Sequence, residues 1–472
     1  MQSAQRRNRI GLYTALTLLS IVSSAGITVI YSMLSVLYRH FPDASAIGWV
    51  VTIYWLVSAI AAALCGRLGD LMGRRKITLW VLGLCMAGAL IAALAASLEW
   101  MIVGCAIQGL ASALTPLAFG ILRENLDAKS IPFAVGLLSA VGMISAGVIY
   151  LSAGVVIDHY SWQGGFWFKL ILALAAMLAV YLAVHHSEPK AGQRVSLFSG
   201  LLFAPGLAAL LVVVQKGAAW GWDAYTWGLL AAGVGVLLVW GRQQWQQPAP
   251  LIDLRLLANR QVIRANLCMV CIGMGCVQIG QVMSLYLQQP GGTLGSFGLS
   301  ATGAGLSMLC INLFSLIGGP LSGRIAARRG ARSAAIIGLS IASAAWAAML
   351  FLHATLAATL ACAVLSTIGF AFAHPAVYNL IIEATPAERT SETTGVTYVF
   401  FACAFALGAQ MIFTLLASDH APPMANALSL PSDLAYMRVF GYVLVMTLAG
   451  LAVAFTLPKR PAKEQVELAL AE

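Results

Sequence analysis

Two ionisable side chains lie inside long apolar runs of this chain, where a charge is costly and therefore suggests a role. His374 precedes Pro375, and a histidine titrates near neutral pH, so it could carry a proton or bind a solute. A neutral histidine hydrogen-bonded to a neighbouring helix is the alternative. Lys169 could extend its ammonium group to the water interface or pair with Asp158, which suits a structural role. His374 is therefore the candidate proton site.

Three of the nine cysteines, Cys268, Cys271 and Cys276, share one face of an expected helix and could hold a soft metal ion. No histidine or acid in the same run would complete four ligands, and small polarizable side chains also let helices approach closely. We therefore predict no metal and no cofactor. No Gly-x4-Gly-Lys-Ser/Thr loop and no His-Glu-x-x-His set is present, so neither ATP use nor an enzyme is expected.

The elements that position these residues follow from composition. Hydrophobic residues make up 60% of the 472 residues and charged residues 9%, against roughly 45–50% and about 25% in a soluble domain. Apolar stretches of about 20 residues or more, enough to cross a hydrocarbon core as a helix, recur along the chain. We predict fourteen transmembrane helices near residues 10–37, 45–65, 77–97, 100–122, 132–157, 163–184, 196–214, 224–241, 262–287, 299–323, 333–352, 355–382, 392–417 and 438–457.

The placement of charge predicts the orientation. A net charge of +10 would suggest a nucleic-acid partner in a soluble protein, but here the charges follow the loops. Of 27 Lys and Arg residues, all but Arg39, Lys169, Lys216 and Arg438 lie in or beside segments that are cytoplasmic if the N-terminus is cytoplasmic. This is the positive-inside bias of short loops. We expect both termini in the cytoplasm and no nucleic-acid binding.

A ten-residue pattern occurs twice, at the ends of expected helices 2 and 10. Gly66-Arg-Leu-Gly-Asp-Leu-Met-Gly-Arg-Arg75 aligns without gaps to Gly323-Arg-Ile-Ala-Ala-Arg-Arg-Gly-Ala-Arg332, at a constant offset of 257 residues. The repeat predicts two six-helix halves with helices 7 and 8 inserted between them. We expect an N-terminal six-helix bundle at 1–190, the inserted pair and its linker at 191–250, and a C-terminal six-helix bundle at 251–472.

The loop after helix 2 suits either a gate or a simple anchor. Its glycines allow a tight reversal, and its arginines lie at the depth of the cytoplasmic headgroups. Asp70 needs a partner, and an arginine or a helix N-terminus of the same half would hold the cytoplasmic side closed in one state. Positive-inside bias alone would also supply the arginines. The candidate gating residues are Gly66, Asp70, Gly73, Arg74, Arg75, Gly323, Arg324, Gly330 and Arg332.

The run from Gly66 to Lys76 closely resembles the signature loop between helices 2 and 3 of the major facilitator superfamily. Fourteen spans with an inserted pair are similar to its drug:proton antiporter branch, and Ser161-Trp-Gln-Gly-Gly-Phe-Trp-Phe168 resembles that branch's entry into helix 6. The resemblance implies an all-α polytopic membrane protein with the major facilitator fold, two six-helix bundles plus two inserted helices. It also implies alternating access around a cavity lined by helices 1, 2, 4, 5, 9, 10, 12 and 13.

Three motifs of that branch are missing. The branch has an acid in helix 1, where this chain reads Ser24-Ala-Gly-Ile-Thr-Val-Ile-Tyr31, and an arginine in helix 4, where Cys105 stands three residues before Gln108. The glycine-rich motif of helix 5 lacks its proline. Both charges usually linked to proton exchange are therefore absent, and the resemblance to antiporters lies in the architecture.

Uncharged polar and aromatic side chains occupy the helices that the resemblance assigns to the cavity. Each could instead hold helices together, but as a set they suit an amphipathic or aromatic solute, because apolar walls with a few hydrogen-bonding groups orient a ligand without demanding charge. The candidate cavity residues are Tyr31, Tyr54, Trp55, Gln108, Tyr150, Gln278, Gln281, Asn312, His374, Tyr378, Asn379 and Gln410.

These features predict a secondary transporter. Export of small amphipathic or hydrophobic compounds, such as a drug or a metabolite, is the function that the fourteen-helix resemblance favours. An importer or facilitator of a small organic solute and a non-transporting accessory membrane protein are the alternatives. The expected partners are the solute, the lipid bilayer and, if transport is coupled, protons. The short loops fit a bacterial inner membrane.

Overall fold

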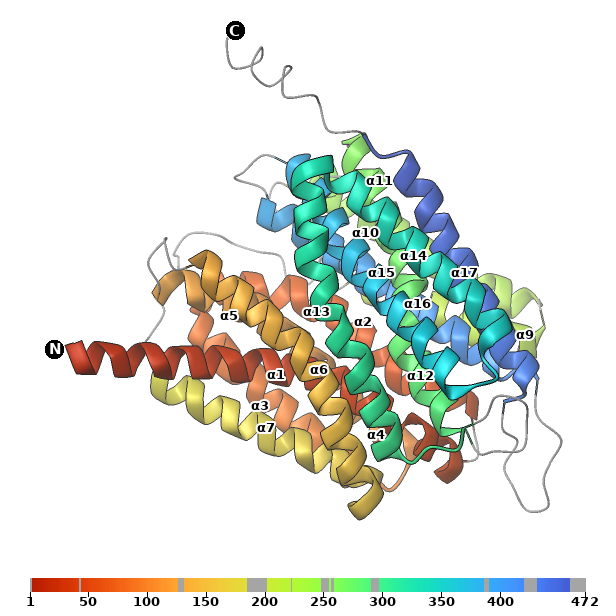
Figure 1. Ribbon diagram of the computed structural model, residues 1–472, viewed down its shortest axis with the longest axis horizontal. Coiled ribbons are helices and arrows are strands. Elements are labelled where there is room, and N and C mark those ends of the chain that lie inside the picture. Colours follow the sequence, from red (N-terminus) through yellow and green to blue (C-terminus); the bar gives the residue numbers. More distant parts are fainter. Residues whose placement is uncertain are drawn as a thin grey trace, which may run out of the picture.

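The computed structural model describes residues 2–41, 44–125, 131–184, 202–221, 223–247, 254–255, 259–289, 297–385, 390–419 and 431–458. These residues form long α-helices joined by short connections (Figure 1). The helices are α1 (Gln2–His40), α2 (Ala44–Met72), α3 (Arg74–Ala93), α4 (Leu98–Gln108), α5 (Leu114–Asn125), α6 (Ile131–Tyr160), α7 (Trp162–Ala183), α9 (Phe203–Trp220), α10 (Ala224–Gln246), α11 (Arg260–Met274), α12 (Ile279–Gln288), α13 (Ala301–Arg329), α14 (Ala331–Leu352), α15 (Leu356–Glu383), α16 (Thr390–Leu416) and α17 (Asp433–Phe455).

The prediction of an all-helical membrane protein is confirmed. Within the described residues, eleven helical segments are long and apolar enough to cross a membrane, and three shorter apolar helices lie at Ala46–Ala62, Ile144–Tyr160 and Phe203–Val214. Most predicted ends agree with the structure to within a few residues. The helix expected at 196–214 ends later than predicted, because α9 continues to Trp220, where Gly221 turns the chain with a φ of 74°.

Polar side chains fix several helix starts that hydropathy alone placed poorly. Ser432 caps α17 by accepting the backbone N–H of Ala435 at 3.1 Å, so this helix begins at Asp433 rather than at residue 438. Asp223 caps α10 by accepting the N–H of Thr226 at 2.9 Å, and this bond holds the pKa of the exposed Asp223 carboxyl below its usual value. Residues 420–430 of the expected outer loop lie outside the described residues.

Two segments predicted as single helices are interrupted. A 3-10 turn at Gly109–Ala113 separates α4 from α5, and Gly275 with a 3-10 turn at Cys276–Gln278 separates α11 from α12. At Gly109 the chain lies so close to the carbonyl oxygen of Tyr54 that an added Cβ would come within 2.6 Å of it. Backbone that leaves the α-helix inside a membrane must find other hydrogen-bond partners, so both breaks need support from neighbouring side chains.

The helices gather in two groups, which we call the N group (α1 to α7) and the C group (α11 to α17). Each group contains one crossing at which two glycines bring the backbones together. An ideal Cβ on Gly104 would lie 2.6 Å from the carbonyl oxygen of Gly88, and one on Gly338 would lie 2.6 Å from that of Gly369. Such small-residue contacts pack membrane helices without cavities, and they make each group a tightly joined unit.

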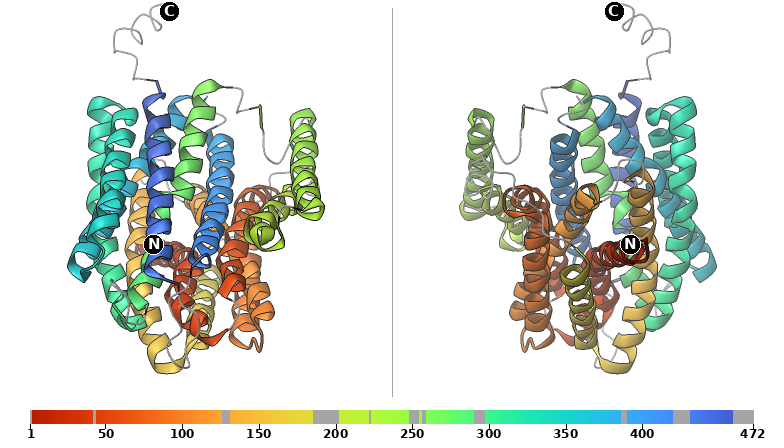
Figure 2. Two further views of the ribbon diagram at one scale, coloured as in Figure 1. Left: turned by 90° about the vertical axis from the view of Figure 1, so that its right-hand side faces the viewer. Right: turned by 90° about the vertical axis from the view of Figure 1, so that its left-hand side faces the viewer.

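The helices α9 and α10 pack on each other and stand at the edge of the molecule, in yellow-green in Figure 2. α9 contacts both α2 of the N group and α16 of the C group. Its side chains Phe203, Leu207 and Leu211 are buried with Leu56 of α2 and Ala402 of α16. This hairpin therefore covers the seam between α2 and α16 on one side.

We expect Gly338→Ala to destabilise the protein, because the added methyl would meet the backbone of Gly369 and Ala373 at 2.6 Å. Overpacking of this kind costs about 1–3 kcal/mol. The measurement is the thermal unfolding midpoint of the purified protein. Gly441→Ala is the matched control, because nothing lies within 4 Å of its new methyl group. Equal unfolding temperatures for the two variants would contradict the close crossing of α14 and α15.

Candidate functional site

Aromatic side chains from both helix groups meet around Trp55 of α2. Its ring stacks on Phe405 of α16 with a centroid distance of 4.1 Å and an interplanar angle of 21°. Tyr54 contacts the same indole edge-on at 5.9 Å, and the indole Nε1 donates a hydrogen bond of 3.2 Å to the hydroxyl of Tyr31 on α1. The seam between the groups is thus aromatic at this point.

His374 of α15 extends this set within the C group. Its ring lies 5.1 Å from Phe370, 5.0 Å from Tyr378 and 5.2 Å from Phe401, and Phe401 in turn contacts Trp55 at 6.4 Å. In the described part of the chain, no hydrogen bond or carboxylate reaches the imidazole. The aromatic cluster, as we call it, consists of Tyr31, Tyr54, Trp55, Phe370, His374, Tyr378, Phe401 and Phe405.

The exposure of the cluster indicates where a solute could contact it. Trp55, His374 and Tyr378 are half-buried, although they lie well inside their helices. Aromatic faces of this kind attract apolar and aromatic groups, and a cation over the ring is also favoured. The sequence pointed to five of the eight members. It missed Phe370, Phe401 and Phe405. Residues 370, 374 and 378 share one face of α15, and residues 401 and 405 share one face of α16, and these four-residue spacings could have revealed them.

Several other predicted cavity residues serve helix contacts. Gln278 is fully buried, and its amide donates to the carbonyl oxygens of Gly273 at 2.8 Å and Phe405 at 3.0 Å, which supports the break before α12. Gln281 donates to Ala409 at 3.4 Å. These amides join α11 and α12 to α16 inside the C group.

The remaining predicted residues lie at different places. The Gln410 side chain accepts a bond of 2.9 Å from Thr52, across the two groups. Asn312 donates to Met308 of its own helix at 2.8 Å, and Asn379 is exposed beyond Tyr378. Tyr150 packs at the contact of α6 with Gly280, and Gln108 lies in a separate pocket of the N group.

The two glycine-arginine loops adopt the same backbone conformation. Gly73 has a φ of 93° and Gly330 a φ of 85°, a region that strongly favours glycine. Arg75 donates to the carbonyl oxygen of Tyr181 near the end of α7 at 2.7 Å, and Arg332 donates to that of Phe455 at the end of α17 at 2.6 Å. Both arginines therefore bind helix C-termini, where a cation is favourable.

Arg74 makes contacts that have no counterpart among the described residues of the second loop. Its guanidinium donates to Gly120 at 2.6 Å and pairs with Glu124 at 3.3 Å, both on α5. Gly323 and Arg324 are exposed at the end of α13. The positions of the Arg67 and Asp70 side chains and the surroundings of Gly66 lie outside the described residues, so the expected partner of Asp70 stays a prediction.

The N and C groups are hydrogen-bonded at the end of the molecule away from these loops. Asp158 at the end of α6 accepts the N–H groups of Ala301 at 3.0 Å and Thr302 at 2.8 Å, the first residues of α13. Ser35 and Arg39 of α1 donate to the carbonyl oxygen of Gln288 on α12, each at 3.4 Å. Figure 1 shows α6 and α13 converging here and separating toward the other end. One end of the seam is therefore closed.

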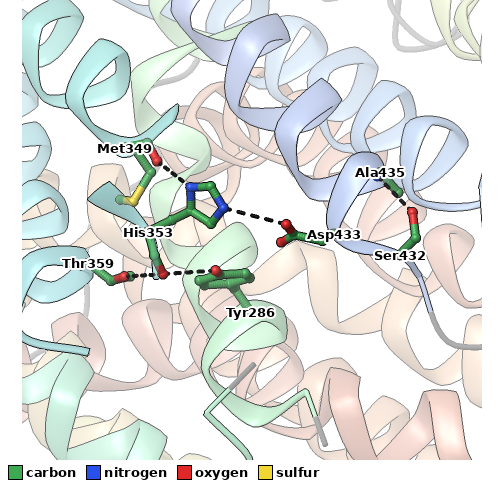
Figure 3. Close-up of polar contacts among 7 residues, drawn as sticks. All are labelled: Tyr286, Met349, His353, Thr359, Ser432, Asp433 and Ala435. Atoms are coloured by element: carbon green, nitrogen blue, oxygen red, sulfur yellow. Dashed lines mark hydrogen bonds and ion pairs between the residues drawn. The ribbon is translucent and has the colours of Figure 1, made fainter. Parts of the chain in front are cut away.

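A polar cluster fixes the C group at this closed end (Figure 3). His353, just after α14, places its Nε2 at 3.6 Å from the carboxylate of Asp433 at the start of α17. The carbonyl oxygen of His353 accepts bonds of 3.1 Å from Tyr286 of α12 and Thr359 of α15. Four helices of the C group are thereby joined by one residue.

Lys169 neither reaches the interface nor pairs with Asp158, so both alternatives taken from the sequence are wrong. It is buried on α7, and its ammonium group donates to the carbonyl oxygen of Gly26 on α1 at 2.7 Å. Asp158 is engaged by α13 instead. The turn of α7 directs Lys169 inward, which the position along the chain could not show.

The cysteines of α11 also serve packing. The Cys268 thiol lies 3.6 Å from the carbonyl oxygen of Gly450 on α17 and donates to it. Among the residues that the structure describes, no three His, Cys, Asp or Glu side chains come together in a way that could hold a metal ion.

The family model described as Major Facilitator Superfamily matches residues 16–409 and 270–470. Among curated proteins, the chain is 26% identical over 376 residues to the tetracenomycin C resistance and export protein of Streptomyces glaucescens, covering 78% of this chain and 69% of that protein. It is 27% identical over 308 residues to the uridine/deoxyuridine transporter of Lactococcus lactis subsp. cremoris, covering 63% of each. A D-xylose-proton symporter structure has the same fold, with a TM-score of 0.68, 14% identity and coverage of 95% and 97%.

We expect Asp158→Asn to loosen the closed end, because the neutral amide interacts less favourably with the N-terminus of α13. A loss of about 1–2 kcal/mol in the free energy of local opening corresponds to roughly tenfold faster amide hydrogen exchange in the first turn of α13. Asp223→Asn removes an equivalent helix-capping charge from α10 and is the control. Unchanged exchange at Ala301 and Thr302 in the Asp158 variant would show that this bond does not hold the seam.

Proposed function

Because the chain belongs to the Major Facilitator Superfamily, we propose that it is a secondary transporter that exports small amphipathic compounds containing aromatic groups. The observation that carries this proposal is the aromatic cluster between the two helix groups, of which Trp55, His374 and Tyr378 are half-buried. Binding at a seam between two rigid groups can be coupled to their movement, because the solute contacts both. The similarity to a resistance and export protein supports export as the direction.

We place fourteen helices across the membrane with both termini in the cytoplasm. The eleven long apolar segments and the three shorter ones supply this number, with α4–α5 and α11–α12 each crossing once. The basic loops then face the cytoplasm, as positive-inside bias requires. In this topology the divisions are 1–190, 191–250 and 251–472, the architecture of the fourteen-span drug:proton antiporter branch. Its bacterial relatives support a bacterial inner membrane.

With this orientation the structure is closed toward the outside. The Asp158 bonds and the α1–α12 contacts lie on the outer side, and the glycine-arginine loops lie on the side where the groups separate. Alternating access then requires the outer bonds to break while the loops of the candidate gate approach each other. The bonds described above for Arg74, Arg75 and Arg332 lie within one group each, which would keep each loop rigid while the groups move.

Proton coupling is assigned to His374. It is the member of the aromatic cluster whose side chain ordinarily titrates near neutral pH, and a bound aromatic solute would contact the same ring faces. Competition between a solute and a proton for one site is sufficient for exchange of the two across the membrane. The acids of the antiporter branch are absent from helix 1, so another group must carry the proton if exchange occurs.

Nucleoside uptake is the second candidate, because the uridine/deoxyuridine transporter is as similar in sequence as the export protein. A nucleoside would stack its base on Trp55 and use the uncharged amides for its ribose. A panel of solutes in liposomes separates the two functions: uptake of uridine with no movement of lipophilic aromatic compounds would favour the nucleoside function over the exporter. No movement of any solute would favour an accessory protein.

We expect Trp55→Ala to raise the solute concentration for half-maximal transport about fivefold, because one aromatic stacking surface is lost. The measurement is the uptake of a fluorescent lipophilic aromatic compound into liposomes that contain the purified protein. Trp80→Ala is the control, because Trp80 is 64% exposed on α3. An equal loss of apparent affinity in both variants would show that the aromatic cluster does not bind the solute.

His374→Ala is expected to abolish proton movement that depends on solute, while part of the solute movement persists. The readout is a pH-sensitive dye inside the liposomes after addition of the same compound. His353→Ala is the comparison, since His353 lies in the polar cluster at the outer end. Proton flux equal to that of the unmodified protein at every pH would exclude His374 from coupling.

A further inference from the structure

A pocket inside the N group contains polar groups that the proposed transport site does not use. It is lined by residues of α1, α3, α4, α7 and the turn after α4, among them Gly26, Cys85, Gln108, Lys169 and Leu172. Most of the lining is apolar. Two side chains with hydrogen-bond donors, Lys169 and Gln108, face the same space.

Lys169 is a cation without a counter-charge. Its side chain is 7% exposed, and its one hydrogen bond in the described chain goes to the carbonyl oxygen of Gly26 at 2.7 Å. An ammonium group has three N–H donors, so two remain. The titratable groups that face it are the thiols Cys85 and Cys105, and no carboxylate of the described residues pairs with it. The Phe166 ring, whose centre lies 5.6 Å from the ammonium nitrogen, offsets part of the cost of burying this charge, and an anion would offset the rest.

Gln108 is the second unsatisfied group. Its side chain is 1% exposed, and neither its Nε2 nor its Oε1 has a partner in the described chain. A buried amide that makes no hydrogen bond costs about 1–3 kcal/mol. The two unsatisfied groups lining one pocket indicate a ligand that accepts hydrogen bonds from both.

Tyr54 lies between the pocket and the aromatic cluster. The Tyr54 hydroxyl packs against Gly26 so closely that no side chain fits at that position. The ring of Tyr54 contacts Trp55, which belongs to the cluster. Tyr54 therefore contacts a pocket residue on one side and the cluster on the other.

We propose that the pocket of Lys169 and Gln108 binds one monovalent anionic group, and that in transport this group is the carboxylate of an amphipathic aromatic solute. A carboxylate accepts from the ammonium group and from the Gln108 amide at once, and it neutralises the single charge. A phosphate dianion would leave excess negative charge in an apolar pocket. The proposal rests on the proposed function for the identity of the solute; the anion site itself does not.

The test compares two probes of equal shape, 1-naphthoate and its neutral amide, 1-naphthamide. Binding is followed by the thermal unfolding midpoint of the purified full-length protein in sodium gluconate at constant ionic strength. We expect naphthoate to bind at least about tenfold more tightly than naphthamide, because a charge-assisted bond is made only by the acid. Lys169→Met should remove this preference, and Arg242→Met, which removes an exposed charge from α10, should keep it.

If Lys169→Met does not fold, Gln108→Leu provides the test. This variant should weaken the binding of naphthoate severalfold and leave the binding of naphthamide unchanged. If chloride also raises the unfolding midpoint and competes with naphthoate, the anion site is supported, and free anions bind to it as well. Equal binding of naphthoate and naphthamide, or a preference that persists in both pocket variants, would overturn the proposal. Either result would leave the Trp55 transport experiment, and with it the proposed function, unaffected.

Discussion

The interior of a bilayer offers no water to a free backbone N–H or C=O group, and most features of this structure answer that constraint. Long uninterrupted helices satisfy it within themselves. Where a helix breaks, a side chain takes the place of the lost bond, as Gln278 does by donating to Gly273 before α12. In the unbroken helix α1, the carbonyl oxygen of Gly26 accepts a hydrogen bond from Lys169, in the segment that packs against Tyr54. Polar side chains in this protein therefore serve the backbone first.

Glycines bring backbones close together both inside each helix group and between the groups. Inside, glycines such as Gly104 and Gly369 bring two backbones to the limit of contact, which resists sliding and separation. Between the groups, Gly154 of α6 and Gly305 of α13 form a similar crossing, beside the exposed bonds of Asp158, which can be exchanged for bonds to water at small cost. Any movement of the two groups relative to each other therefore has to part this crossing as well as these bonds.

The seam also holds the aromatic cluster, and the two facts together explain why a solute could drive the movement. A ligand shifts an equilibrium only by binding one state better than the other. Trp55 and Phe405 come from different groups, so separation of α2 from α16 changes the contact surface that a solute meets. The charges of the antiporter branch are missing from helices 1 and 4, yet Lys169 of α7 faces both Gly26 and Cys105. The N group thus has a cation at that depth, contributed by another helix.

The sequence by itself determined where most helices begin and end, because about 20 apolar residues cross a membrane wherever they occur in a chain. It also identified the repeated loop, since the requirement for glycine at residues 73 and 330 is local. Only the tertiary structure decided which polar groups meet. Lys169 and Gly26 are 143 residues apart, and Thr52 and Gln410 are 358 apart. Contacts over such separations depend on how each helix is rotated about its axis, and a hydrophobic run that faces lipid and protein on different sides leaves that rotation open.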